Sequence, residues 1–227
     1  MLRKWEDLPT SLQNEAVRPY YDKLRRCKGQ LLAKRVFDFA AALILLILLS
    51  PIMLVLAIAI KVDSPGEVMF RQVRVTRYGQ EFRIFKFRTM VKNAQSLGTQ
   101  VTVQGDARVT RMGKILRKCR LDEVPQLLNI LKGEMSFVGT RPEVPKYVAA
   151  YTPEMMATLL LPAGVTSQAS IQYKDEDTLL ANCQDADKNY IEEVLPGKMK
   201  YNLESIMEFS FWKDIRTMFE TVLAVIR

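Results

Sequence analysis

The chain has 227 residues, with 33 Lys and Arg against 25 Asp and Glu, a net charge of +8 and a sequence pI near 9.4. This length suits one compact domain, and the basic balance indicates an acidic partner such as nucleic acid, anionic lipid or a phosphorylated substrate. Because histidine is absent, the sequence excludes Ser-His-Asp triads, Cys-His dyads and His-ligated metals. The three cysteines form no CxxC pair, which indicates a reducing compartment.

Residues 1–33 are predicted to be an N-terminal extension in which apolar groups recur at loosely helical intervals among charged ones. The pattern indicates a helix that lies on a membrane interface or on the rest of the domain.

A long apolar run covers residues 36–60 and contains Asp38 as its only charge. Pro51 removes the backbone hydrogen bond to the Ile47 carbonyl, and Ser50 can donate to the carbonyl that this frees. Each half of the run is roughly 21 Å long or less, which is short of the ~30 Å hydrocarbon thickness of a bilayer. A half-length segment can enter the membrane and return.

Basic residues flank the run on both sides, although a spanning helix normally carries them at its cytosolic end. They are Lys23, Arg25, Arg26, Lys28, Lys34 and Arg35 before it and Lys61, Arg71, Arg74 and Arg77 after it. Residues 34–61 are therefore predicted to form a re-entrant helix-break-helix segment, with both ends held by anionic headgroups of the cytosolic leaflet. The main alternative is a straight or kinked single pass; a cleaved signal peptide and a buried core helix fit the pattern less well.

Residues 62–227 are expected to be the cytosolic part. Residues 67–90 predict a β-hairpin that turns at Tyr78-Gly79-Gln80, with one apolar face and one row of cations. Residues 110–120 predict an amphipathic helix, and residues 210–226 another. The apolar face of the first comprises Met112, Ile115, Leu116 and Cys119.

Asp122 and Glu123 follow that cationic helix and precede a short helix, which starts near Pro125 and ends at Gly133. The buried side of this helix is predicted to carry Leu127, Leu128 and Leu131. A carboxylate at such a place can ligate Mg²⁺ or attack phosphorus, while helix N–H groups and cations neutralise phosphoryl oxygens. On spacing alone the pair is more simply interpreted as capping residues favoured by the helix dipole.

Five motifs occur together in a fixed order: Lys34-Arg35, Ser50-Pro51, KFRTM from Lys86, LDEVPQ from Leu121 and MSFVGTRPE from Met135. In this combination the chain resembles the bacterial sugar transferases known as monotopic phosphoglycosyltransferases, over roughly residues 33–227. The resemblance implies an α+β fold: a re-entrant membrane helix with a small cytosolic helical domain and an associated β-hairpin, all one sugar-transferase domain.

The resemblance also implies a reaction at the cytosolic face of the bacterial inner membrane. A UDP-sugar donor would phosphorylate the enzyme and release UMP, and undecaprenyl (polyprenyl) phosphate would then take the phospho-sugar, which initiates a surface glycan. Membrane lipid and Mg²⁺ would be the further partners, a homodimer is possible, and nucleic acid is not expected.

By motif position, Asp122 would be the nucleophile, and Glu123 would assist it by positioning the metal or the substrate. Basic residues that match family positions would contact phosphates or the uridine nucleotide: Lys86, Arg88, Arg117 and Arg141. Asp214 aligns with an acidic residue near the family's site. Lys34, Arg35, Ser50 and Pro51 would belong to the membrane segment.

Two motif positions depart from the family pattern. Thr140 stands where the family often has proline, and Ser167 stands where it often has glycine. The first change spares Arg141, whereas the second alters a loop expected to touch the donor, so the identity of the sugar stays open. The competing hypotheses are a catalytically silent membrane-anchored adaptor and a nucleic-acid binder; the second would explain the charge but not the apolar run.

Overall fold

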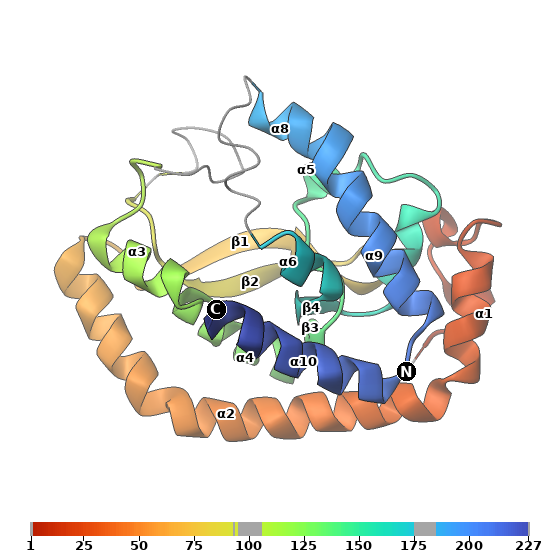
Figure 1. Ribbon diagram of the computed structural model, residues 1–227, viewed down its shortest axis with the longest axis horizontal. Coiled ribbons are helices and arrows are strands. Elements are labelled where there is room, and N and C mark those ends of the chain that lie inside the picture. The colour runs from red at the N-terminus through yellow and green to blue at the C-terminus, as the bar shows by residue number, and fades with distance from the viewer. Residues whose placement is uncertain (1, 93, 95–105, 175–184, 227) are drawn as a thin grey trace.

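The computed structural model of the protein describes residues 2–92, 94, 106–174 and 185–226. These form a mixed helix-and-strand fold above one long helix, α2 (Lys28–Asp63), which runs along the bottom of the view in Figure 1. Strands β1 (Met69–Val75) and β2 (Glu81–Phe87) pair antiparallel, and β3 (Met135–Val138) and β4 (Ala163–Thr166) pair parallel. The α+β class predicted from the sequence is confirmed.

The shorter helices surround these strands, and α10 lies between the strands and α2 in the view of Figure 1. They are α1 (Arg18–Arg26), α3 (Arg111–Lys118), α4 (Leu127–Lys132), α5 (Pro145–Val148), α6 (Gln168–Gln172), α8 (Ala186–Asn189), α9 (Leu195–Met207) and α10 (Phe211–Ile226). Five 3-10 helices, at Trp5–Asp7, Thr10–Leu12, Arg77–Gly79, Leu121–Gln126 and Met155–Leu160, and one π-helix, at Tyr190–Val194, also lie in the described part of the chain.

The hairpin lies where the sequence predicts it, with Val75 opposite Glu81 at its closed end. The turn follows from local chemistry, since Tyr78 and Gly79 both take positive φ values, 63° and 75°, and glycine does so without strain. The predicted single row of cations is wrong. Arg71 and Arg83 are exposed, whereas Arg74 and Lys86 point inward and pair with carboxylates.

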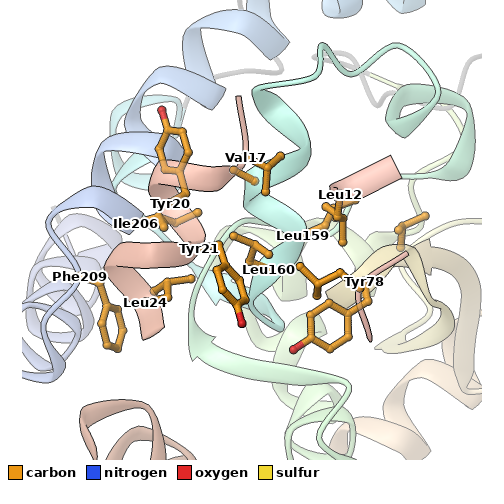
Figure 2. Packing of buried hydrophobic residues seen from close by; sticks show 13 residues of the cluster. Leu12, Val17, Tyr20, Tyr21, Leu24, Tyr78, Leu159, Leu160, Ile206 and Phe209 are labelled. Carbon is orange, nitrogen blue, oxygen red and sulfur yellow. The ribbon is translucent and has the colours of Figure 1, made fainter. Parts of the chain in front are cut away.

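The N-terminal extension packs on the domain and contributes much of its largest hydrophobic cluster (Figure 2). Leu12, Tyr21 and Leu24 are buried against residues from distant parts of the chain, namely Tyr78, Leu159, Leu160, Ile206 and Phe209. Of the two positions predicted for this segment, on the interface or on the domain, the structure supports the second.

Helix α2 is longer than the predicted segment and is continuous through Pro51. It bends between a longer and a shorter arm (Figure 1), as expected where proline deletes a backbone hydrogen bond. The Ser50 hydroxyl donates to the Ile47 carbonyl at 2.8 Å, which confirms the predicted compensation. The most apolar 18 residues of α2 have a mean hydropathy of 3.1 and are only 6% buried, so the helix is long and apolar enough to cross a membrane.

Both cations of the Lys34-Arg35 motif attach α2 to the domain. Lys34 donates to Asp214 of α10 at 2.6 Å and to the Val138 carbonyl at 2.9 Å. Arg35 donates to the carbonyls of Ile130 and Leu131 at the end of α4, at 2.7 and 3.1 Å.

The helices around the carboxylate motif differ in detail from the prediction. Thr110 caps α3 by accepting from the Gly113 N–H, and Leu116 is fully buried, but Ile115 is 56% exposed and Cys119 is exposed. The predicted apolar face of α3 is therefore too wide, because only a narrow side of this short helix packs against α2 and β2. In α4, Leu127 is buried as predicted, but the other buried residues are Asn129 and Ile130 rather than Leu128 and Leu131, which are half-buried.

Candidate active site

Asp122 and Glu123 lie in the first turn of the 3-10 helix Leu121–Gln126. Arg120 precedes them in a left-handed conformation with φ of 55°, which ends α3 and turns the chain sharply. Both carboxylates are thereby buried, with 8% and 9% of each residue exposed. Buried ionised groups require partners, so their surroundings decide what they can do.

Glu123 has two cationic partners. Lys86 of β2 reaches Oε1 at 2.9 Å, and Arg141, from the loop after β3, reaches Oε1 at 2.5 Å and Oε2 at 3.4 Å. Burial alone would raise the pKa of Glu123, but the charges and hydrogen bonds of Arg141 and Lys86 hold it well below its usual range. Burial lowers the pKa of Lys86, and Glu123 opposes that shift.

Asp122 has a different environment, although it is the next residue. Its Oδ1 is buried and has no hydrogen-bond partner among the described residues. Burial raises the pKa of Asp122, the negative charge of Glu123 adds to that effect, and Lys86, Arg117 and Arg141 oppose it. Glu123 therefore binds two cations, whereas one oxygen of the neighbouring carboxylate is buried without a donor.

The other predicted site residues lie at different distances from this pair. Arg117 of α3 donates to the Thr89 hydroxyl at 3.0 Å and lines the same cavity as Asp122. Arg88 also lines the cavity, but its guanidinium binds the end of α2 through the carbonyls of Ser64 at 2.6 Å and Pro65 at 3.2 Å. Asp214 lies outside this lining and pairs with Lys34.

The cavity over the carboxylates has a volume of about 1740 Å³ and is lined by many cations. It also contains four residues that sequence reasoning missed: Arg74, Glu143, Tyr190 and Lys198. The GTRPE motif could have drawn attention to Glu143, whereas no local pattern marks Tyr190 or Lys198.

The two motif departures have structural explanations. The Thr140 carbonyl accepts from the Gly164 N–H at 2.8 Å, a bond that does not depend on the side chain at position 140. Ser167 caps α6, because its hydroxyl accepts from the Ser170 N–H at 3.0 Å. The cavity is lined by the neighbours Thr166 and Ser170 rather than by Ser167.

A divalent cation has limited protein ligands here. No group of three or more acidic, cysteine or histidine side chains suitable for a metal occurs in the described ranges. The Asp122 Oδ1 atom nevertheless fits as one ligand, because it is a buried carboxylate oxygen without a donor. Mg²⁺ commonly binds through one or two carboxylates together with water and substrate phosphates, so the site suits metal that arrives with a diphosphate.

A buried carboxylate pair, cations from three separate segments and an adjoining long apolar helix together define a site suited to an anionic substrate. The profile of the family described as bacterial sugar transferase matches residues 29–227. The chain belongs to this family.

Curated relatives are similar over most of this chain. A UDP-N-acetylgalactosamine-undecaprenyl-phosphate N-acetylgalactosaminephosphotransferase of Aeromonas hydrophila is 38% identical over 85% of this chain and 43% of its own length. UDP-glucose:undecaprenyl-phosphate glucose-1-phosphate transferases are 36% identical in Caulobacter vibrioides, over 84% of this chain and 68% of the relative, and 37% identical in Escherichia coli, over 90% and 42%. This chain thus spans less than half the length of two of these three relatives.

Proposed function

We propose that this protein transfers a sugar 1-phosphate from a UDP-sugar to undecaprenyl phosphate, with Asp122 as the nucleophile. The observation that carries the proposal is the unpartnered, buried Oδ1 of Asp122 beside a Glu123 that two cations hold in place. The names of the relatives support the donor and acceptor classes.

In the first step an Asp122 oxygen attacks the phosphorus that carries the sugar. A bond forms between the carboxylate and phosphorus, the bond from that phosphorus to the bridging oxygen breaks, and UMP leaves with the electron pair. In the second step an oxygen of undecaprenyl phosphate attacks the same phosphorus. The aspartyl–phosphorus bond breaks, the Asp122 carboxylate is regenerated, and undecaprenyl diphospho-sugar leaves.

Repulsion between a carboxylate and a diphosphate opposes the first step, so positive charge must surround the reacting phosphorus. Lys86 and Arg141 supply it, and Glu123 holds both in position while it avoids protonation because its pKa is low. Arg117 lines the same cavity and adds a third cation. Bound with the donor at Asp122, Mg²⁺ would neutralise the diphosphate charge further.

The membrane segment explains how the acceptor reaches the site. Helix α2 exposes large apolar side chains along its length, among them Val36, Ile47, Leu48, Leu54, Val55 and Ile58. Helix α10 adds Trp212 and Phe219, which are 76% and 68% exposed. These surfaces suit lipid. We propose that α2 is re-entrant and that the protein is monotopic, on the cytosolic face of the bacterial inner membrane, where it initiates a surface glycan.

Purified protein in detergent or nanodiscs should release UMP from at least one member of a UDP-sugar panel when Mg²⁺ and undecaprenyl phosphate are present. Asp122→Asn should abolish the release, because an amide cannot form the acyl phosphate. Radiolabelled donor without acceptor should leave label on Asp122 in the parent protein. Release of UMP by Asp122→Asn at the parent rate would refute Asp122 as the nucleophile. If the parent protein released no UMP with any donor, the transferase activity itself would be refuted.

Topology can be tested with single cysteines in a variant without Cys27, Cys119 and Cys183. Arg25→Cys and Glu81→Cys place thiols at exposed positions before and after α2. Re-entry predicts that an impermeant reagent labels both from the cytosolic side only. Labelling from opposite sides would establish a single pass instead.

A further inference from the structure

Glu143 lies two residues after Arg141 and is the centre of a second buried network. Its carboxylate accepts from the Tyr190 hydroxyl at 2.5 Å, and Lys198 of α9 lies 3.6 Å away. Lys198 also donates to the Tyr190 hydroxyl at 2.8 Å, so the three groups form a closed triangle. Side-chain exposure is only 5% for Lys198 and 6% for Glu143, so water does not screen these contacts.

The hairpin holds the same segment from the opposite side. Arg74 of β1 donates to the Pro142 carbonyl at 3.0 Å and approaches the Glu143 carboxylate at 3.8 Å. The Val75 N–H donates to the Glu143 carbonyl at 2.9 Å. The backbone between Arg141 and Glu143 is therefore fixed at consecutive points, and Pro142 restricts its φ in addition.

Arg141 depends on this arrangement more than Lys86 does. Lys86 projects from a paired strand, whereas Arg141 lies in a loop between β3 and α5 and its side chain is 30% exposed. A side chain on a loop keeps a defined direction only where the backbone beneath it is held. Because Glu143 is the buried charged residue of this loop, its partners help to determine where the Arg141 guanidinium lies relative to Glu123.

We propose that Tyr190 and Lys198 are positioning residues, which act through Glu143 to hold Arg141 against Glu123. This inference rests on the proposed function, since it assigns Arg141 a part in phosphoryl transfer. It gives a role to the chain around the π-helix Tyr190–Val194, whose irregular turn brings the Tyr190 hydroxyl to a carboxylate 47 residues away in sequence.

The test is a double-mutant cycle on kcat/KM for UMP release with Tyr190→Phe and Arg141→Lys. Tyr190→Phe keeps the ring and removes the hydroxyl, and we expect a loss of about tenfold, because the two contacts belong to one network. In the Arg141→Lys background the same change should cost less than about twofold. A purely structural Tyr190 would lower active protein equally in both backgrounds, so equal losses would overturn the proposal.

Tyr20→Phe is the matched control, since the Tyr20 hydroxyl also donates to a glutamate, Glu154, at 2.6 Å, but in the N-terminal cluster. It should leave kcat/KM unchanged in both backgrounds. Lys198→Arg should retain more activity than Lys198→Met, because arginine keeps a buried donor for Tyr190.

The same cycle can be read in the melting temperature without any donor. If the parent protein releases no UMP, the proposed function fails, but non-additive melting temperatures for Tyr190→Phe and Arg141→Lys would still support the positioning contact. If the parent is active, additive changes in melting temperature together with equal activity losses in both backgrounds would overturn the positioning proposal.

Discussion

Two buried glutamates, Glu123 and Glu143, are each held by one cation from the β-hairpin and one from elsewhere in the chain. Glu123 has Lys86 of β2 and Arg141, and Glu143 has Arg74 of β1 and Lys198 of α9.

The difference lies in what else these cations touch. Arg74 also donates to Gln72 and the Pro142 carbonyl, and Lys198 donates to Tyr190, so the cations around Glu143 bind mainly protein groups. Lys86 and Arg141 instead act electrostatically on Asp122, whose Oδ1 has no donor among the described residues. A buried ion pair can thus present charge to a substrate or fasten a loop, and its remaining contacts distinguish the two roles.

The largest effect on activity within this comparison is expected from Glu123→Gln. The amide leaves Lys86 and Arg141 without an anion and disturbs the charge around the reacting phosphorus, so kcat/KM for UMP release should fall by about 100-fold or more. Glu192→Gln is the control, since the Glu192 side chain is 61% exposed, and it should retain parent activity. A loss below about threefold for Glu123→Gln would show that Glu123 does not organise the charge around the reacting phosphorus.

The two hairpin cations, Arg74 and Lys86, allow a sharper comparison, because each one pairs with the buried glutamate of its own cluster. Arg74→Met should lower the free energy of unfolding by about 2–3 kcal/mol, since it removes a half-buried partner of Glu143 and the hydrogen bonds to the Pro142 carbonyl and the Gln72 side chain. Lys86→Met should lower kcat/KM by at least about tenfold with a smaller change in unfolding. Chemical denaturation and UMP release measure the two quantities, and the reverse pattern would exchange the roles assigned to the clusters.

Sequence reasoning predicted the parts that depend on local chemistry. The hairpin turn at Tyr78-Gly79, the Ser50 bond beside Pro51 and the amphipathic α10 need only neighbouring residues to specify them. The resemblance supplied Asp122 and Glu123, whose burial and unequal pKa shifts then emerged from the structure.

Contacts between distant segments could not be predicted in the same way. The observed partners of Arg88 and Asp214 are Ser64 and Lys34, which are 24 and 180 residues away in sequence, and the substrate contacts expected of both side chains stay predictions. The exposure of Ile115 likewise depends on how much of α3 the rest of the fold covers, which helical periodicity does not encode.

A smaller effect, common to both clusters, is expected from Gly164→Ala. A Cβ there would lie 2.2 Å from the backbone of Gly139, so β4 would be forced away from the start of the loop that carries Arg141 and Glu143. We expect a loss of about 1–3 kcal/mol in the free energy of unfolding. Gly29→Ala is the control, because a Cβ meets nothing within 4 Å in helix α2, and it should be neutral or stabilising by up to about 1 kcal/mol. Equal melting temperatures for the two variants would contradict this packing.

The smallest effect concerns a tyrosine–glutamate bond remote from both clusters. Burial, together with the hydrogen bond to Glu154, raises the pKa of Tyr20 to about 12, above the usual tyrosine value of 10.0. The folded state therefore retains the proton more strongly than the unfolded chain, and the stability that this contributes is present below pH 10 and is lost as the pH rises towards 12. Denaturation from pH 8 to 12 should show a shallower decline for Tyr20→Phe than for the parent, and identical slopes would contradict the shifted pKa.

Both arms of α2 are tied to the body of the protein, by Lys34 and Arg35 near one end and by Arg88 at the other. These contacts near both ends of α2 thus set the angle between its two arms. In the proposed membrane-bound state, the height of Asp122 above the lipid phosphates is consequently built into the fold. Inserting one helical turn into either arm should change the orientation of α2 relative to the rest of the protein. The catalytic centre would then stay intact but lie away from its acceptor.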